Sequence, residues 1–203
     1  MKGRGFDFAR RIAEGVVGVD GKPQKAFEGA RLPEYQTRHS AGADFFCAEE
    51  VIVPSVWSNL WRVLKSDLKL RSFSLESDDA NGIKDAKTFF APIFAPTVVH
   101  TGIKAWMEDD EVLELYNRSS NPGKFGLVLA NSVGVVDADF FENCTDDGEI
   151  RFAFYNFMPF PVKIKVGDRI GQGVFKKFLR PTENLCVKDE VRVGGVGSTG
   201  TGV

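Results

Sequence analysis

The sequence predicts an all-β fold, a sandwich or barrel built from many short strands. Runs of β-branched and aromatic residues recur along the chain, and Gly, Pro, Asn and Asp separate them at the spacing of a strand plus a turn. Alternating βαβ units would need helical segments between these runs. The expected strands are Thr97 to Ile103, Val112 to Tyr116, Gly126 to Leu129, Val133 to Val136, Glu149 to Phe157, Val162 to Val166 and Ile170 to Phe178.

The first part of the chain carries weaker signals. Residues 1–40 are rich in glycine and charge, which predicts mostly loop, with a short strand near Phe6 and a turn at Asp20-Gly21. Asp44 to Val53 has the composition of a strand. Pro54 ends it, because proline cannot donate to a strand ladder.

One segment departs from the β pattern and predicts a helix. From Val56 to Leu70 the apolar residues recur at helical spacing, namely Trp57, Leu60, Trp61, Leu64 and Leu68. Ser55 or Ser58 is expected to cap its start. A polar tract follows, so we interpret residues 55–90 as an insertion of one amphipathic helix and a loop. Its tryptophans either cover apolar surface, on the same domain or at an oligomer contact, or dock a partner protein.

Size and charge limit the class of protein. A chain of 203 residues is long enough for one well-packed domain, which we expect to span residues 1–203. Its 26 basic and 28 acidic side chains nearly cancel and form no long block of one sign. Nucleic-acid and membrane-surface partners normally need a concentrated basic face, so neither is expected. No stretch approaches the roughly 18 apolar residues of a membrane span.

The cysteines and the start of the chain indicate a cytoplasmic protein. Cys47, Cys144 and Cys186 are widely spaced and form no CxxC pair, so neither a zinc site nor a disulfide framework is supported. The basic start MKGRGFDFARRIAEG lacks the apolar core of a signal peptide.

The stretch from Arg118 to Asp139 carries most of the candidate chemistry. It opens on a cation and two hydroxyls, Arg118, Ser119 and Ser120, just before an expected turn at Asn121-Pro122-Gly123. A nearly uncharged run that looks like a buried strand pair follows, and two carboxylates, Asp137 and Asp139, close it. This order suits a charged small molecule, although the two acids are equally consistent with charges that solubilise a strand end.

Other candidates lie outside this stretch. Asp44 follows small residues in AGADFF, and Asp168 and Gln172 lie in GDRIGQGVF, where a turn and a solvated strand residue are the simpler interpretations. The end of the chain contains a GxGxxG pattern, but too few residues follow it to form the helix that a dinucleotide site requires. This tail is either disordered or an arm whose backbone and hydroxyl donors close over phosphates.

Five motifs together resemble the trimeric dUTP pyrophosphatases, or dUTPases. They occur in the same order as in that family, and their residues are most similar to those of the forms from Gram-positive bacteria and their phages. The motifs are AGADFFCAEE, RSSNPGKFGLVLANS, GVVDADF with GEIRFAFYN, VGDRIGQGVF and the tail RVGGVGSTG.

The resemblance implies a fold, an assembly and a reaction. It implies a homotrimer of jelly-roll-like β-barrels whose active sites are shared between subunits, each completed by a flexible C-terminal arm of about residues 190–203. It implies Mg²⁺-dependent hydrolysis of dUTP to dUMP and pyrophosphate, which limits uracil in DNA and supplies dUMP for dTMP synthesis. The expected location is the cytoplasm, that of the host if the protein is phage-encoded.

The resemblance also implies roles for individual residues. Asp137 activates the attacking water, Gln172 contacts phosphate and water, and Asp44 holds Mg²⁺ through water. Uridine enters a β-hairpin pocket in which Asn131 contacts the base and Phe140 packs on the deoxyribose. The full set of implied substrate-binding residues is Arg118, Ser119, Ser120, Asn131, Gly134, Val136, Phe140, Arg192, Gly197, Ser198 and Thr199.

The chain departs from the family pattern in several places. Phe140 replaces the usual Tyr, Val196 replaces the aromatic residue of the arm, and the family arginine often lies one residue earlier than Arg192. Extra residues follow Phe140, and residues 55–90 have no counterpart in the minimal enzyme. Two alternative functions remain open. The first is a regulatory protein that binds a repressor-type partner through the insertion. The second is a dCTP deaminase, which needs a carboxylate base that is missing from the expected motif.

Overall fold

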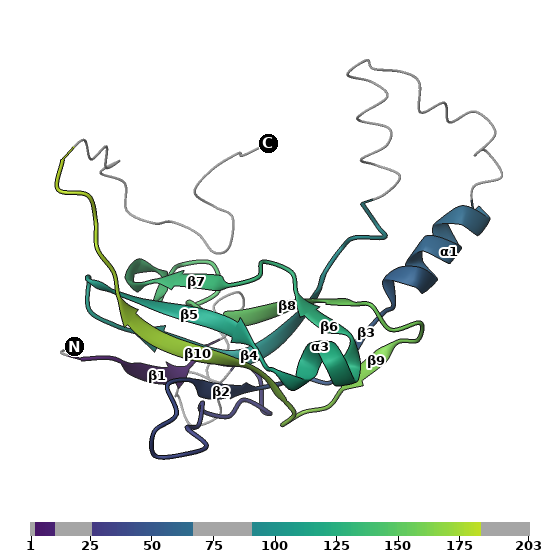
Figure 1. Cartoon of the computed structure of the whole chain (residues 1–203). Helices are drawn as coiled ribbons and strands as arrows, with labels where there is room; N and C mark the ends of the chain where they lie inside the picture. Colours follow the sequence, from purple (N-terminus) through teal and green to yellow (C-terminus); the bar gives the residue numbers. More distant parts are fainter. Residues whose placement is uncertain (1–2, 11–25, 67–90, 184–203) are drawn as a thin grey trace.

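The computed structural model describes residues 3–10, 26–66 and 91–183, and within them two antiparallel sheets form a jelly-roll-like barrel (Figure 1). The first sheet runs in the order β1 (Gly5–Phe8), β4 (Thr97–Trp106), β8 (Ile150–Asn156), β6 (Leu127–Leu129). The second runs β2 (Ala43–Phe46), β10 (Arg169–Lys177), β5 (Glu111–Asn117), β7 (Gly134–Asp137). A ribbon of β3 (Val51–Val53) and β9 (Val162–Ile164) completes it. The all-β prediction is confirmed.

The expected strands are found, with one division. The stretch predicted as a single strand from Asp44 to Val53 splits into β2 and β3. The chain leaves the first ladder at Cys47, whose N–H donates to the carbonyl of Asp168, and the N–H of Ala48 then donates to the carbonyl of His100. The turn expected at Asp20-Gly21 lies outside the described residues.

The core fills the space between the two sheets with aromatic rings. Phe45 of β2 and Phe152 of β8 are fully buried, and their ring centroids lie 5.6 Å apart. Two glycines of β10 make room for them: a Cβ on Gly171 would lie 2.0 Å from the Phe152 ring, and one on Gly173 would lie 2.6 Å from the Phe45 ring. Because side chains alternate along a strand, Gln172 between these glycines faces away from the core.

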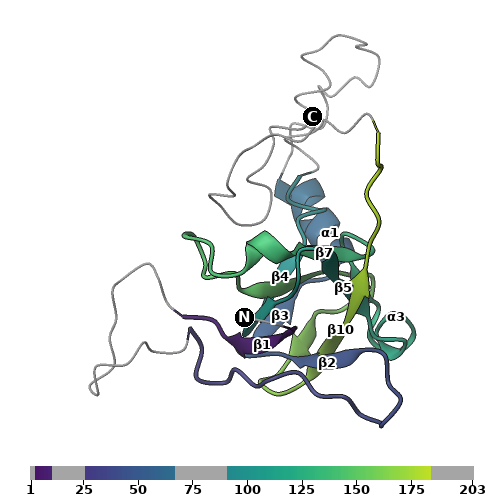
Figure 2. The ribbon, with the colours of Figure 1, turned by 90° about the vertical axis from the view of Figure 1, so that its left-hand side faces the viewer.

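Helix α1 (Val56–Ser66) confirms the helical prediction over the described residues, and its tryptophans do not cover the surface of the same domain. Ser55 caps it, since its Oγ accepts the N–H of Trp57 at 3.2 Å. Within the described residues Val56 is buried, whereas Trp57 and Trp61 are 56% and 61% exposed. The first turn is tied to the barrel through the Trp57 indole N–H, which donates to the carbonyl of Phe157 at 3.0 Å, and the helix then projects away from the sheets (Figure 2).

The expected turn at Asn121-Pro122-Gly123 is wrong, because these residues belong to the short helix α3 (Ser120–Phe125). Pro122 lies in the first turn, where its missing N–H costs nothing. Gly126, with φ of 60°, ends the helix in the left-handed conformation, and its N–H donates to the carbonyl of Pro122. In the part of the chain that the structure describes, no helix has the length and apolar character needed to cross a membrane.

Candidate functional site

Four of the predicted substrate-binding residues line a single pocket of about 430 Å³ between β7 and β8. We call it the β7–β8 pocket. Gly134 and Val136 come from β7, Asn131 from the turn before it, and Phe140 from the 3₁₀ helix η2 (Ala138–Phe140) that follows. Phe140 is only 5% exposed, so its ring forms part of the pocket wall and the core at once.

The pocket is not a regular hairpin, which corrects the prediction. β6 pairs with β8 and β7 pairs with β5, so the two strands joined by the turn at residues 130–133 belong to different sheets. The turn is sharp, with Ser132 at φ of 59°. Among the described strands β7 is consequently the last of its sheet, so one of its backbone edges faces the pocket that its own residues line and not another described strand. An open strand edge offers N–H and C=O groups to a ligand.

A second group of predicted residues gathers around Asp44. Its carboxylate is 1% exposed; Oδ1 accepts from Gln172 Nε2 at 2.9 Å, and Oδ2 accepts from Arg169 Nη1 at 3.1 Å. The register explains this contact, because Asp44 and Gln172 are paired across β2 and β10 on the outer face of the sheet. Asp168, by contrast, is a turn residue whose Oδ2 accepts the N–H of Lys165, as its simpler interpretation predicts.

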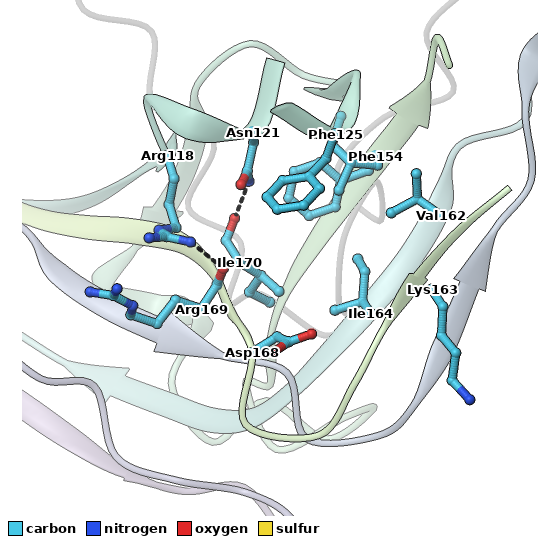
Figure 3. Close-up of a pocket in the computed structure, with 11 residues that line it drawn as sticks. Arg118, Asn121, Phe125, Phe154, Val162, Lys163, Ile164, Asp168, Arg169 and Ile170 are labelled. Carbon is cyan, nitrogen blue, oxygen red and sulfur yellow. Dashed lines mark hydrogen bonds between the residues drawn. The ribbon is translucent and has the colours of Figure 1, made fainter. Parts of the chain in front are cut away.

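The turn with the hydroxyl groups is fixed to the start of β10 (Figure 3). Arg118 Nη1 donates to the carbonyl of Arg169 at 3.0 Å, and the buried Asn121 donates to the carbonyl of Ile170 at 2.8 Å. Ser119 is exposed and its side chain makes no capping hydrogen bond, so its hydroxyl faces solvent. Ser120 begins α3 and is half-buried. A smaller hollow of about 140 Å³ lies behind this turn.

Asp137 is remote from the Asp44 group in the same chain. It faces a separate hollow with Asp109, Asp139 and Arg180. Asp137 is opposite Val112 of β5 and Gln172 is opposite Tyr116 of β5. The four residue steps from 112 to 116 span roughly 13 Å along the strand, and β7 and β10 flank β5 on opposite sides. One water molecule cannot contact both side chains in a single chain.

The residues present are compatible with a hydrated Mg²⁺ ion. Asp44 accepts two hydrogen bonds, and a carboxylate has about four lone-pair directions, so it can also accept from water bound to a metal. Over residues 3–10, 26–66 and 91–183, no three His, Cys, Asp or Glu side chains gather to hold a metal directly. The remaining predicted residues, Arg192, Gly197, Ser198 and Thr199 with Val196, lie outside the described residues.

Glu149, Arg151 and Val98 also line the β7–β8 pocket and were not predicted. Val98 and Arg151 belong to β4 and β8, strands that were predicted, but alternation alone does not show which outer face is hollowed. Glu149 is engaged on both sides: Oε1 accepts the N–H of Gly102 at 3.0 Å, and Oε2 lies 3.0 Å from Nδ1 of His100.

The His100–Glu149 pair predicts a stability that depends on pH. The contact with Glu149 raises the pKa of His100 above its ordinary value of 6.5. The protonated pair therefore stabilises the fold fully below that ordinary value, and this contribution is lost as pH rises through the higher pKa of the folded state. We expect His100→Gln to reduce the free energy of unfolding more at about pH 6 than at about pH 9. Denaturant titrations at equal protein concentration measure this, and an equal reduction at both pH values would contradict it.

Comparisons with known proteins identify the family of the chain. The dUTPase family model matches residues 82–200. The deoxyuridine 5′-triphosphate nucleotidohydrolase of Lactococcus lactis subsp. lactis (strain IL1403) is 46% identical over 172 residues, which are 85% of this chain and 89% of that protein.

Solved structures show the same fold. The dUTPase from Streptococcus mutans is 30% identical, with a TM-score of 0.57 over 87% of this chain and 98% of that one. A variant dUTPase from phage phi11 of S. aureus, described with a structural Mg(II) ion, is 18% identical, with a TM-score of 0.52 over 82% of this chain and 95% of that one. Because the family model covers more than half of the sequence and a relative of 46% identity spans most of it, the chain belongs to the dUTPase family.

Proposed function

We propose that the chain hydrolyses dUTP to dUMP and pyrophosphate, with Mg²⁺ as cofactor. The observation that carries this proposal is the β7–β8 pocket, in which Asn131, Gly134, Val136 and Phe140 line one hollow of nucleoside size. The relatives that match along most of the chain are named as deoxyuridine 5′-triphosphate nucleotidohydrolases.

Uracil binds against the open edge of β7. Backbone N–H and C=O groups there, together with the Asn131 amide, meet the polar edge of the base. Gly134 leaves room for this amide, because a Cβ at position 134 would lie 3.3 Å from Asn131 Nδ2 and 3.0 Å from Leu115 Cβ. Cytosine presents a donor at position 4, where uracil presents an acceptor, and an acceptor at N3, where uracil presents a donor. These fixed groups therefore reject it strongly, while thymine is rejected by the bulk of its methyl group. Phe140 packs on the deoxyribose.

The triphosphate binds beside the Asp44 group. Arg118 and the hydroxyls of Ser119 and Ser120 donate to phosphate oxygens, and Gln172 donates to phosphate or to the attacking water. Asp44 would hold Mg²⁺ through water, which suits an ion that dehydrates reluctantly. When bound, the ion neutralises charge on the phosphates. The resemblance to the family implies further phosphate contacts from Arg192, Gly197, Ser198 and Thr199, which lie outside the described residues.

Asp137 serves as the general base. It takes a proton from a water molecule, which attacks the α-phosphorus in line while pyrophosphate leaves on the opposite side. Positioning and charge stabilisation supply most of the catalysis in phosphoryl transfer, so the protein needs few chemically active groups.

The separation of Asp137 from Gln172 implies that each site combines two chains. Both side chains stand on the outer face of the sheet β2-β10-β5-β7, at different ends of it. One active site therefore takes Asp137 from one copy and Gln172 from the next. Such a contact joins two different surfaces, and repeating it closes a ring. We propose that this ring is the homotrimer, so that an isolated monomer is inactive.

A nucleotide panel tests the proposed activity. With Mg²⁺ present, we expect rapid pyrophosphate release from dUTP and at least about 100-fold lower kcat/KM for dTTP, dCTP and UTP. Ammonia release from dCTP is measured in parallel to test the deaminase alternative. Absence of pyrophosphate release from dUTP at every Mg²⁺ concentration would overturn the proposal. The regulatory alternative is not favoured, because the relatives matched along most of the chain are named as nucleotidohydrolases.

A further inference from the structure

Arg151 occupies a defined place along the β7–β8 pocket. Glu149, Arg151 and Ala153 alternate with core residues of β8 and line the same wall. Ala153 marks the end nearest the base, because its carbonyl accepts the N–H of Ala130, next to Asn131, at 2.8 Å. Arg151 lies two residues away, about 7 Å along the strand, in the direction of Glu149. Its position is therefore beyond the base, toward the sugar.

The residues between Phe140 and Glu149 hold Arg151 in place. We call residues 141–148 the pocket loop. Asp146 of this loop forms an ion pair with Arg151 through Oδ2 and Nη2, and its other oxygen accepts from Asn143 Nδ2 at 2.8 Å. Asn143, only 5% exposed, donates with the same amide to the carbonyl of Phe140 at 3.0 Å.

The pocket loop is itself anchored to the barrel. Lys104 of β4 is fully buried, and its Nζ lies 2.9 Å from Asp147 Oδ2 and 2.9 Å from Glu142 Oε1. A buried ammonium group needs such partners. If the loop moved away from the barrel, the charge of Lys104 would remain buried without a partner, which is strongly unfavourable. The loop therefore provides a rigid support for the Arg151 guanidinium.

The chemistry of Arg151 selects its ligand atom. A guanidinium only donates, and the ion pair with Asp146 engages one terminal nitrogen, so a residue that lines this pocket has further N–H groups to offer to a ligand oxygen. Toward the sugar end, a 2′-deoxynucleoside 5′-triphosphate carries one hydroxyl, at the 3′ position. We propose that Arg151 donates a hydrogen bond to the 3′-oxygen of the deoxyribose, with Asp146 as its positioning residue. This proposal rests on the assignment of the β7–β8 pocket to the nucleoside.

The test compares dUTP with 2′,3′-dideoxyuridine triphosphate, which lacks only this hydroxyl. We expect the unmodified protein to prefer dUTP by about 10- to 100-fold in kcat/KM, the usual effect of a hydrogen bond from a charged donor. Arg151→Gln should lower kcat/KM for dUTP by a similar factor and leave the dideoxy substrate within about 3-fold. The proposal would be overturned if Arg151→Gln lowered kcat/KM equally for both substrates, or if this variant preferred dUTP as strongly as the unmodified protein does.

Two further variants separate this contact from a folding effect. Asp146→Asn keeps an oxygen for the loop hydrogen bonds and removes the charge that orients Arg151, so the preference should fall partly, through KM more than kcat. Arg31→Gln makes the same change as Arg151→Gln at an exposed ion pair with Glu34, and should leave the preference unchanged. An Asp146→Asn variant with full preference and unchanged KM would refute the positioning role. If the unmodified protein hydrolyses neither substrate, the proposed function fails instead.

Discussion

Asp137→Asn is expected to lower kcat for dUTP by about 10²- to 10⁴-fold, the usual cost of losing a general base. The amide has the shape of the carboxylate but cannot accept the proton of the attacking water. Asp137 ends β7 on the outer face of the sheet, opposite Val112, so the substitution removes no core contact. Single-turnover pyrophosphate release, with dUTP affinity measured separately, distinguishes lost chemistry from lost binding.

Asp139→Asn provides the matched control for this result. Asp139 lies on η2, two residues along the chain, and lines the same hollow. Asp139→Asn changes the electrostatic potential in this hollow almost as much as Asp137→Asn does. We nevertheless expect its turnover to stay within about 3-fold of the unmodified protein, as for an ordinary surface charge. If Asp137→Asn released pyrophosphate at the unmodified rate, the assignment of the base would be wrong. If both variants lost turnover equally, the negative charge of the hollow, and not a general base at Asp137, would be the cause.

Mixing two inactive variants is expected to restore activity. Gln172→Ala should lower kcat by about 10²- to 10³-fold, the range for losing a donor to the transition state. If each site takes Asp137 and Gln172 from different copies, an equal mixture with Asp137→Asn rebuilds some intact sites. Random assembly restores roughly one quarter of full activity, because each of the two required residues is intact in half of the copies. Co-expression of the two variants followed by dUTP titration measures the recovery.

A site contained in one chain gives the opposite outcome. Every chain in the mixture would then carry one defect, and no combination of subunits would recover activity. A control mixture of Asp137→Asn with the double variant Asp137→Asn/Gln172→Ala should stay inactive under either arrangement. The comparison therefore isolates where the two halves of the site come from, independently of how strongly each residue contributes.

The strands were predictable because their signal is local. β4, β5 and β10 alternate or run as apolar stretches between turn residues, and the structure places them within a few residues of the expected limits. The pairing of Asp44 with Gln172 is different. Its hydrogen bond joins residues 128 positions apart, and only the resemblance to a family placed both residues at one site.

The features that were missed depend on partners distant in the sequence. Asn121 looks like a turn residue, but its amide joins α3 to the carbonyl of Ile170, 49 residues away. Lys104 lies just beyond the expected strand, where a lysine would ordinarily be exposed, yet it is buried because Asp147 and Glu142 of the extra loop pair with its charge. β6 and β7 resemble a hairpin in sequence, but β6 pairs with β8 and β7 pairs with β5, so the two strands belong to different sheets.

Because β6 and β7 belong to different sheets, the barrel has an open strand edge at β7 among the described strands. A complete barrel would join the edge of β7 to another strand, whereas here the same edge faces the β7–β8 pocket. A bound nucleoside would take the place of that strand, with its base supplying the hydrogen bonds and its sugar the packing. The substrate would thus occupy the strand edge that the protein leaves open. A molecule that binds the folded form in this way also stabilises it against unfolding. Through Phe140, which belongs to both the core and the pocket wall, the bound sugar would pack directly against the hydrophobic core.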